Sequence, residues 1–88
     1  MLVMVIERFR NGDANAVGER FRRCGRMLPD GVVYHASWID RDGGRCFQLM
    51  EASRLELLQE WMSRWEDLVD FEVIPVQSSA DFWASGGD

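Results

Sequence analysis

The chain has 88 residues, with ten Lys and Arg against fifteen Asp and Glu, so its net charge is −5. This length is enough for one domain with a small core. Apolar residues make up 47% of the sequence, which is typical of a folded protein. The negative charge argues against a nucleic-acid partner, because phosphate contacts need clustered positive charge. No apolar run approaches the about 18 residues that cross a bilayer, and none resembles a signal peptide, so we expect a cytoplasmic protein without a membrane partner.

The first half of the chain predicts a strand, a helix and a hairpin. Residues 2–6 are apolar and rich in β-branched side chains, which indicates a strand buried on both faces. Asp13 is a candidate N-cap for a helix that extends through Met27. The apolar positions of this helix recur at helical spacing: Val17, Phe21, Cys24 and Leu28. Residues 32–40 and 45–51 predict two strands joined by a tight turn.

Four arginines lie in the second half of the first predicted helix: Arg20, Arg22, Arg23 and Arg26. Positive charge there complements the negative end of the helix dipole. A solvated face that matches the dipole explains these residues, and an anion site is the alternative.

The second half of the chain predicts a helix and a strand. Ser53 and Glu56 have the spacing of a capping box at the helix start. The buried stripe, with its margins, is expected to contain Leu55, Leu58, Trp61, Met62, Trp65, Leu68 and Val69. Glu60 and Arg64 can pair across one turn. Residues 70–77 predict the last strand, whose Pro75 is tolerated only at a sheet edge.

The resulting order is strand, helix, strand, strand, helix, strand. It predicts an α+β, ferredoxin-like βαββαβ domain over residues 1–77, with a four-stranded antiparallel sheet in the order 4-1-3-2 and both helices on one face. Residues 78–88 form a C-terminal tail that we expect to fray. The tail contains Phe82 and Trp83, which predicts docking either on the body of the protein or on a partner.

Side chains alternate between the faces of a sheet, so the hairpin register divides its residues into two sets. The larger apolar set is expected under the helices: Ala36, Trp38, Phe47 and Leu49. The mixed set is expected on the opposite face: Val33, His35, Ser37, Ile39, Cys46, Gln48 and Met50. Residues 2–6 are apolar on both faces, so a single copy would expose an apolar patch. We therefore expect a homodimer whose two sheets pack face to face as a dimeric α/β barrel, with a cavity between them.

The mixed face supplies the candidate ligand-binding residues His35, Ser37, Cys46, Gln48 and Met50. His35 suits acid–base chemistry at neutral pH, and a hydrogen-bonded interface histidine is the alternative. Ser37 and Gln48 can fix a polar group of a ligand, although Gln48 paired across a two-fold axis explains it equally well. Tyr34 is a candidate for the mouth of the cavity.

The two cysteines, Cys24 and Cys46, are expected on opposite sides of the sheet, too far apart for a disulfide, so both are predicted to be free thiols in a reducing compartment. Cys46 as a nucleophile would need a base such as His35 to lower its pKa. One histidine and two separated cysteines do not match a usual metal-ligand set. No motif predicts a cofactor, and no catalytic residue is assigned.

Four segments together resemble the domain-of-unknown-function family 3303: MLVMVIERF, CGRMLPDGV, the strand pair with SW and RCFQLME, and WEDLVDFEVIPV. The resemblance covers roughly residues 1–77. It implies a ferredoxin-like chain of the dimeric α/β barrel type, with no assigned reaction and no catalytic residues to transfer. The Phe82-Trp83 tail departs from the family pattern.

Three functions remain open from the sequence. The first is a small homodimeric protein of unknown function that binds a small, largely apolar molecule between its two sheets. The second is a cofactor-independent enzyme, monooxygenase-like or lyase-like, that uses His35 in the same cavity; it rests on analogy of fold alone. The third is a structural association module without a ligand. A lined cavity favours the first two, and interdigitated side chains favour the third.

Overall fold

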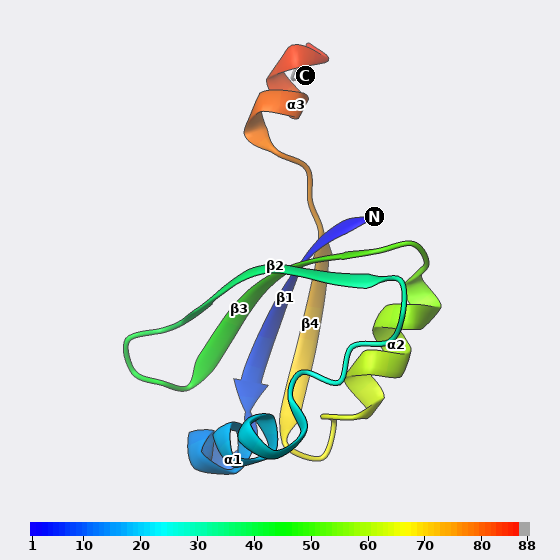
Figure 1. Cartoon of the computed structure of the whole chain (residues 1–88). Coiled ribbons are helices and arrows are strands. Elements are labelled where there is room, and N and C mark those ends of the chain that lie inside the picture. The colour runs from blue at the N-terminus through cyan, green and yellow to red at the C-terminus, as the bar shows by residue number, and fades with distance from the viewer. Residues whose placement is uncertain (87–88) are drawn as a thin grey trace.

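The computed structural model describes residues 1–86 and confirms the predicted order of elements. The elements are β1 (Leu2–Phe9), η1 (Arg10–Gly12), α1 (Ala14–Cys24), β2 (Val32–Ile39), β3 (Arg45–Ala52), α2 (Leu55–Ser63), β4 (Val69–Pro75) and α3 (Ser79–Ala84). The four strands form one antiparallel sheet in the order β2-β3-β1-β4, which is the predicted order read from the other edge. The α+β, ferredoxin-like fold is therefore confirmed (Figure 1).

Both α1 and α2 lie against the same face of the sheet, which we call the covered face, and the opposite side is the open face (Figure 1). The buried core lies under the helices. It consists of Val3, Val5, Phe9, Val32, Cys46, Met50, Ala52, Leu58, Trp61, Trp65 and Val69. Most of this core comes from alternate residues of the strands, as a sheet covered on one side requires.

The central strand β1 is longer than the sequence predicted. It continues past Ile6 to Phe9 and pairs with β3 and β4. Glu7, which follows the predicted strand, lies on the covered face and is only 6% exposed. The strand continues because Glu7 is in phase with Val3 and Val5, and its carboxylate finds a buried partner there.

The hairpin has the predicted register, with Ala36 opposite Leu49 and Trp38 opposite Phe47. The predicted assignment of its faces is wrong. Trp38 is 56% exposed on the open face, whereas Gln48 is buried on the covered face. Gln48 pairs with Val5 in β1, so the burial of β1, rather than the size of the hairpin side chains, decides which set is covered. The register also shifts between Tyr34 and Ala36, which is a bulge.

Helix α1 ends at Cys24, earlier than the predicted end at Met27. Its start is as predicted, because the side chain of Asp13 accepts a hydrogen bond from the backbone N–H of Ala16. The C-cap residue that follows, Gly25, has a φ of 68°. Met27 also has a positive φ, of 60°, so the backbone around the connection to β2 leaves the helical region twice.

Helix α2 begins at Leu55 with Arg54 as N-cap and without a side-chain cap, so the predicted capping box at Ser53 is wrong. Leu58 and Trp61 are buried, as the predicted stripe requires, whereas Leu55 is exposed. Three other positions of the stripe, Trp65, Leu68 and Val69, lie beyond the helix, because it ends at Ser63. Trp65 is buried in the connection that follows, and Val69 is buried in β4. Arg64 does lie 3.7 Å from Glu60, as predicted.

The tail after β4 forms the short helix α3, so the predicted fraying is wrong over residues 79–84; residues 87 and 88 lie outside the described range. Ser78 caps this helix by accepting from the N–H of Asp81. Figure 1 shows α3 projecting away from the sheet and the other helices. Trp83 is 68% exposed, and its ring packs edge-to-face on Phe82. Over residues 1–86, no helix has the length and apolarity needed to span a membrane.

Candidate ligand-binding site

A cavity of about 320 Å³ lies between the covered face of the sheet and α1. Its lining from α1 consists of Ala14, Val17, Gly18 and Phe21, which recur at the spacing of one helix face. Two of these four residues have little or no side chain. No residue of α1 is fully buried, so the helix leaves a space between its inner face and the sheet. The cavity is therefore a consequence of small residues on the inner face of α1.

Aromatic side chains form much of the cavity wall. They are Phe9, Phe21, Trp61 and Trp65. The indole N–H groups of Trp61 and Trp65 both donate to the backbone carbonyl of Arg26, at 3.0 and 3.1 Å. These two bonds fix the connection between α1 and β2 against the wall. Both rings touch the cavity but are otherwise packed against protein, since Trp61 is 1% and Trp65 5% exposed.

A chain of three polar side chains crosses the covered face. Arg26 donates from Nε to Oε1 of Gln48 at 3.2 Å. Gln48 in turn donates from Nε2 to Oε2 of Glu7 at 2.8 Å. All three residues line the cavity. The orientation of the Gln48 amide is thereby fixed by a donor on one side and an acceptor on the other.

Burial is the largest influence on the carboxyl of Glu7 and raises its pKa above the usual value. Hydrogen bonds from Gln48 and Cys46 and the positive charge of Arg26 act in the opposite direction, but they are smaller. Oε2 of Glu7 accepts from Gln48, and Cys46 also hydrogen-bonds to the carboxyl. Glu7 is therefore a nearly buried carboxyl at the polar end of the cavity.

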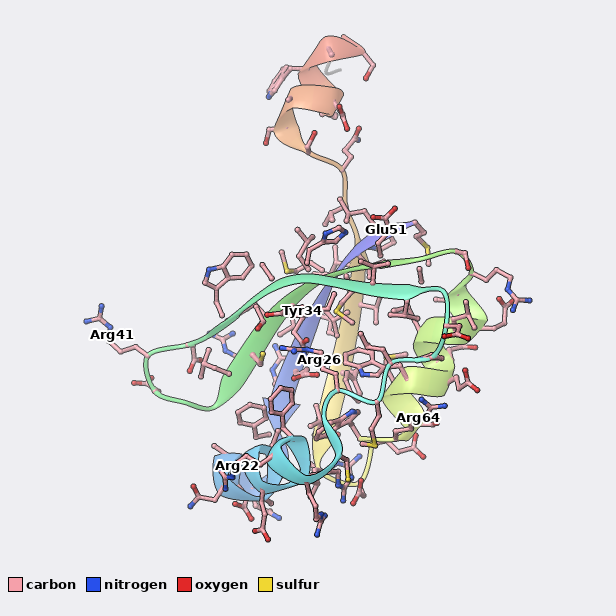
Figure 2. All side chains as sticks on the ribbon, viewed as in Figure 1. Arg22, Arg26, Tyr34, Arg41, Glu51 and Arg64 are labelled. Carbon is pink, nitrogen blue, oxygen red and sulfur yellow. The ribbon has the colours of Figure 1, made fainter. Side chains whose placement is uncertain are left out.

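The guanidinium of Arg26 is held between polar and aromatic groups. Its central carbon lies 3.5 Å from the ring centre of Tyr34 and 5.1 Å from that of Phe21. Its Nη2 donates to Oγ of Ser37 at 3.4 Å, and that hydroxyl also contacts the Tyr34 hydroxyl at 2.8 Å. Figure 2 shows Arg26 reaching across the sheet next to Tyr34. No carboxylate forms an ion pair with it in the described part of the chain.

Comparison with known proteins identifies the family of this chain. A family described as "Domain of unknown function (DUF3303)" matches residues 1–87. The chain belongs to this family. No curated protein and no solved structure matches it significantly. The resemblance recognised in the sequence is confirmed, and because the family description names no reaction, the function of this DUF3303 chain has to be argued from the cavity.

The structure brings three of the five predicted site residues of the DUF3303 chain together. Ser37, Cys46 and Gln48 all line the cavity, but they do so on the covered face rather than on the face where we expected them. Met50 is fully buried on the same covered face and belongs to the core.

His35 is separated from these residues. Its exposed side chain lies on the open face, with Nε2 2.9 Å from Oε1 of Glu51. The prediction that it neighbours Gln48 and Met50 is wrong, because the bulge between Tyr34 and Ala36 and the burial of β1 separate the two sets. The cavity within one protomer therefore contains no histidine.

The two cysteines of the DUF3303 chain are free, as predicted, with Cys24 exposed and Cys46 buried. Burial raises the pKa of the Cys46 thiol to about 12, and the neighbouring charge of Glu7 acts in the same direction. Cys46 is therefore a neutral thiol and lacks the lowered pKa that a nucleophile needs. Among residues 1–86, no group of three or more His, Cys, Asp or Glu side chains is placed to hold a metal ion.

Two residues of the site, Glu7 and Arg26, were missed as site residues by sequence reasoning. The signal for Glu7 is its phase, since it follows Val3 and Val5 at two-residue spacing and precedes Phe9. Arg26 was grouped with the arginines of α1, although it follows Gly25 and so lies outside the helix. Its separation from the helix is what allows its side chain to turn over the sheet.

Proposed function

We propose that this chain binds a small, largely apolar molecule in the cavity between the covered face and α1. The observation that carries the proposal is an aromatic cavity with a buried carboxyl and a guanidinium at its polar end, linked through Gln48. Its volume of about 320 Å³ lies within the range of about 300–1,000 Å³ that is typical of small-molecule sites. The expected ligand site thus lies inside each protomer rather than between two sheets.

Stability alone does not account for this arrangement. A buried carboxyl loses hydration, and apolar residues of similar volume often match or exceed the stability of a buried polar network. The cavity is also open to solvent on one side and leaves apolar lining residues exposed, such as Phe21 at 43% and Ile39 at 56%. The exposed apolar lining and the buried Glu7 would both weaken a purely structural core of this size. Ligand binding accounts for both features.

Nuclear magnetic resonance with 2-methylnaphthalene as probe tests the proposal. A cavity about half this size is known to bind benzene, so a two-ring molecule fits. We expect the indole N–H signals of Trp61 and Trp65 to shift on titration, while that of the distant Trp83 stays in place. Gly18→Leu fills the cavity and should abolish the shifts. Glu19→Leu, at the neighbouring exposed position, is the matched control and should leave them intact.

Two results would contradict binding in this cavity. The first is an absence of any shift for Trp61 and Trp65 at saturating probe. The second is a set of shifts that persists unchanged in a folded Gly18→Leu variant, because the probe would then bind elsewhere.

The open face supports a second part of the proposal, which is that another copy of this chain covers it. Its apolar residues are Leu2, Met4, Ile6, Val33, Ala36, Trp38, Phe47, Leu49 and Ile74. Charged residues of both signs border them, including the pairs of Arg8 with Glu72 and of His35 with Glu51. An apolar centre with a polar rim is typical of protein interfaces, and a rim with both signs can complement itself across a two-fold axis.

Sedimentation velocity tests the homodimer. We expect the wild-type chain to sediment as a dimer and Ile6→Arg, which places a charge at the centre of the open face, as a monomer. Glu19→Arg makes a similar change of charge on the exposed side of α1 and should remain dimeric. A monomeric wild type, or a dimeric Ile6→Arg variant, would contradict this interface.

The two thiols support the cytoplasm as the location. Cys24 is exposed and Cys46 is buried, and they form no disulfide with each other. Exposed thiols persist in reducing compartments. Alkylation of intact cells with a thiol reagent followed by mass spectrometry should modify Cys24, and a blocked Cys24 would argue for another compartment.

A further inference from the structure

We infer that the polar group of the bound molecule is an acidic oxygen, such as a carboxylate, and that Arg26 is the residue that binds it. This inference rests on the proposed function and specifies its ligand class as a small, largely apolar carboxylate or comparable oxyanion. Four observations support it: the unused donors of Arg26, the chemistry of its neighbours, the way the side chain is held, and the charge of the surrounding segment.

Arg26 has more hydrogen-bond donors than the protein uses. Nε donates to Gln48 and Nη2 to Ser37, and these are its only side-chain hydrogen bonds within residues 1–86. Both N–H groups of Nη1 and the second one of Nη2 have no acceptor there. A guanidinium can only donate, and its planar fork matches the two oxygens of a carboxylate. The unused donors therefore match an acceptor with the geometry of an oxyanion.

The neighbours of Arg26 cannot take the place of that acceptor. The carbonyl oxygen of Gln48 is already used by Nε of Arg26, and its amide nitrogen is directed to Glu7. Ser37 is shared with the Tyr34 hydroxyl. Five other arginines among the described residues form an ion pair, as Arg20 does with Asp67 at 2.6 Å. Arg26 is a partly buried cation whose hydrogen-bond partners, Gln48 and Ser37, are neutral.

Glu7 is compatible with an anionic ligand in this site. Burial raises the pKa of its carboxyl and so works against a second negative charge beside the ligand. Cys46 beside it is a neutral thiol. The donors at the polar end of the cavity are those of Arg26. A cationic ligand would meet Arg26 at the same end and be repelled.

The position of Arg26 is fixed before any ligand arrives. Its backbone carbonyl accepts from both Trp61 and Trp65, and its guanidinium lies against the ring of Tyr34. The next residue, Met27, has a positive φ, a conformation that costs energy for a residue with a side chain. Such restraint lowers the entropy that binding has to remove, which favours affinity for a small ligand.

The segment around the cavity is locally positive in a chain with a net charge of −5. Arg22 and Arg23 lie in the last turn of α1, near Arg26, and neither forms an ion pair in the part of the chain that the structure describes. Local positive potential attracts anions from solution even when the whole protein is acidic. The arginines that the sequence explained as a solvated face therefore also favour the alternative of an anion site.

Three probes with one ring system and different charges test the inference on the intact protein. They are 2-methylnaphthalene, 2-naphthoate and 2-naphthylmethylammonium, and binding is followed through the indole signals of Trp61 and Trp65. We expect 2-naphthoate to bind at least about tenfold more tightly than 2-methylnaphthalene, because a hydrogen bond to a charged group is among the stronger ones. The ammonium probe should bind most weakly.

Variants of Arg26 test whether this residue causes the tighter binding of 2-naphthoate. Arg26→Gln should remove the advantage of 2-naphthoate, measured as the ratio of its affinity to that of 2-methylnaphthalene for the same variant. Arg26→Lys should retain part of the advantage, since it keeps the charge and loses the fork. Arg41→Gln removes an equal charge at the exposed tip of the hairpin (Figure 2) and should change nothing.

The possible failures are distinguishable. Tightest binding of the ammonium probe would overturn the inference and make Glu7 the anchor, while ligand binding itself would stand. Equal binding of the three probes, or an advantage of 2-naphthoate that persists in Arg26→Gln, would also overturn the role of Arg26. Absence of binding by all three probes would overturn both the inference and the proposed function.

Discussion

The two faces of the sheet use the same strand in different ways. On the covered face, β1 contributes Val3, Val5 and the buried Glu7, whereas on the open face it contributes Met4 and Ile6. The covered face thus buries a carboxyl beside a cavity, and the open face presents an apolar surface to its surroundings. A protein that worked as a monomer with a purely structural core would reverse these choices. This difference is the basis for our proposals of a ligand on the covered face and a second copy on the open face.

Substitution of one tryptophan on each face tests the difference between the two faces, and it is expected to give the largest change in stability. Trp61, on the buried face of α2, is 1% exposed, packs edge-to-face on Phe71 and donates to Arg26, so Trp61→Ala should lower the free energy of unfolding by about 3–5 kcal/mol. Trp38 is largely exposed on the open face, so Trp38→Ala should have a much smaller effect on the protomer. Urea unfolding at two protein concentrations measures both.

The dependence on concentration separates the two faces. Loss of Trp61 should lower stability equally at both concentrations, because the contacts lie within one chain. Loss of Trp38 should act mainly on the part of the stability that rises with protein concentration, as expected for a dimer contact. Equal, concentration-independent losses for both variants would contradict the assignment of the two faces.

Gln48 and His35 make a second, smaller comparison, between a buried and an exposed polar residue of the same hairpin. Gln48→Ala removes the link between Arg26 and Glu7 and should cost about 1–3 kcal/mol, since buried groups are left without partners. His35→Ala removes an exposed contact with Glu51 and should change protomer stability by less than about 0.5 kcal/mol. Thermal unfolding of both variants, each in the monomeric Ile6→Arg background, gives the difference.

A similar loss in both variants would contradict this comparison. It would mean that His35 is packed as tightly as Gln48, and that this part of the open face is covered within a single chain.

The order of elements was predictable from the sequence because the signals that define it are local. Helical spacing around Val17, the turn residues at 41–44 and the edge position of Pro75 depend on neighbours along the chain. The strand order then followed from the constraints on connections. The register of the hairpin was also predictable, since turn length sets it.

The choice of face was not predictable from the hairpin alone. The prediction placed the larger apolar set, with Trp38, under the helices, but the covered face is decided by pairing with β1 far along the chain. The cavity was missed for a related reason. It depends on Ala14 and Gly18, whose small size matters only once α1 is placed over Glu7. Long-range arrangement, rather than local propensity, defines the site.

Substitution of Glu7 by glutamine tests the covered face by its pH dependence. The folded chain raises the pKa of this carboxyl, so on raising the pH the unfolded chain loses its proton first and the folded state becomes relatively less stable. Glu7→Gln has no such proton to lose. We therefore expect Glu7→Gln to be more stable than the wild type near neutral pH, with the difference shrinking below the usual pKa of a glutamate.

Urea unfolding between about pH 4 and about pH 8 measures that difference. Glu19→Gln, at an exposed position on α1, is the matched control and should follow the wild type throughout. The opposite result, in which Glu7→Gln becomes less stable than the wild type as the pH rises, would contradict the prediction. It would show that the ionised carboxylate is stabilised by its partners.

The smallest effect is expected from the tail, which lies on neither face of its own sheet. Helix α3 projects away from the body, and its aromatic residues Phe82 and Trp83 pack on each other (Figure 1). A chain that ends after Gln77 should therefore melt within about 1 °C of the full chain in the Ile6→Arg background, as for a surface change. A lower melting temperature there would mean that the tail packs on its own body. A different outcome is an unchanged melting temperature in the Ile6→Arg background but a weaker dimer when the chain without Ile6→Arg is truncated. It would show that Trp83 becomes buried only against the partner.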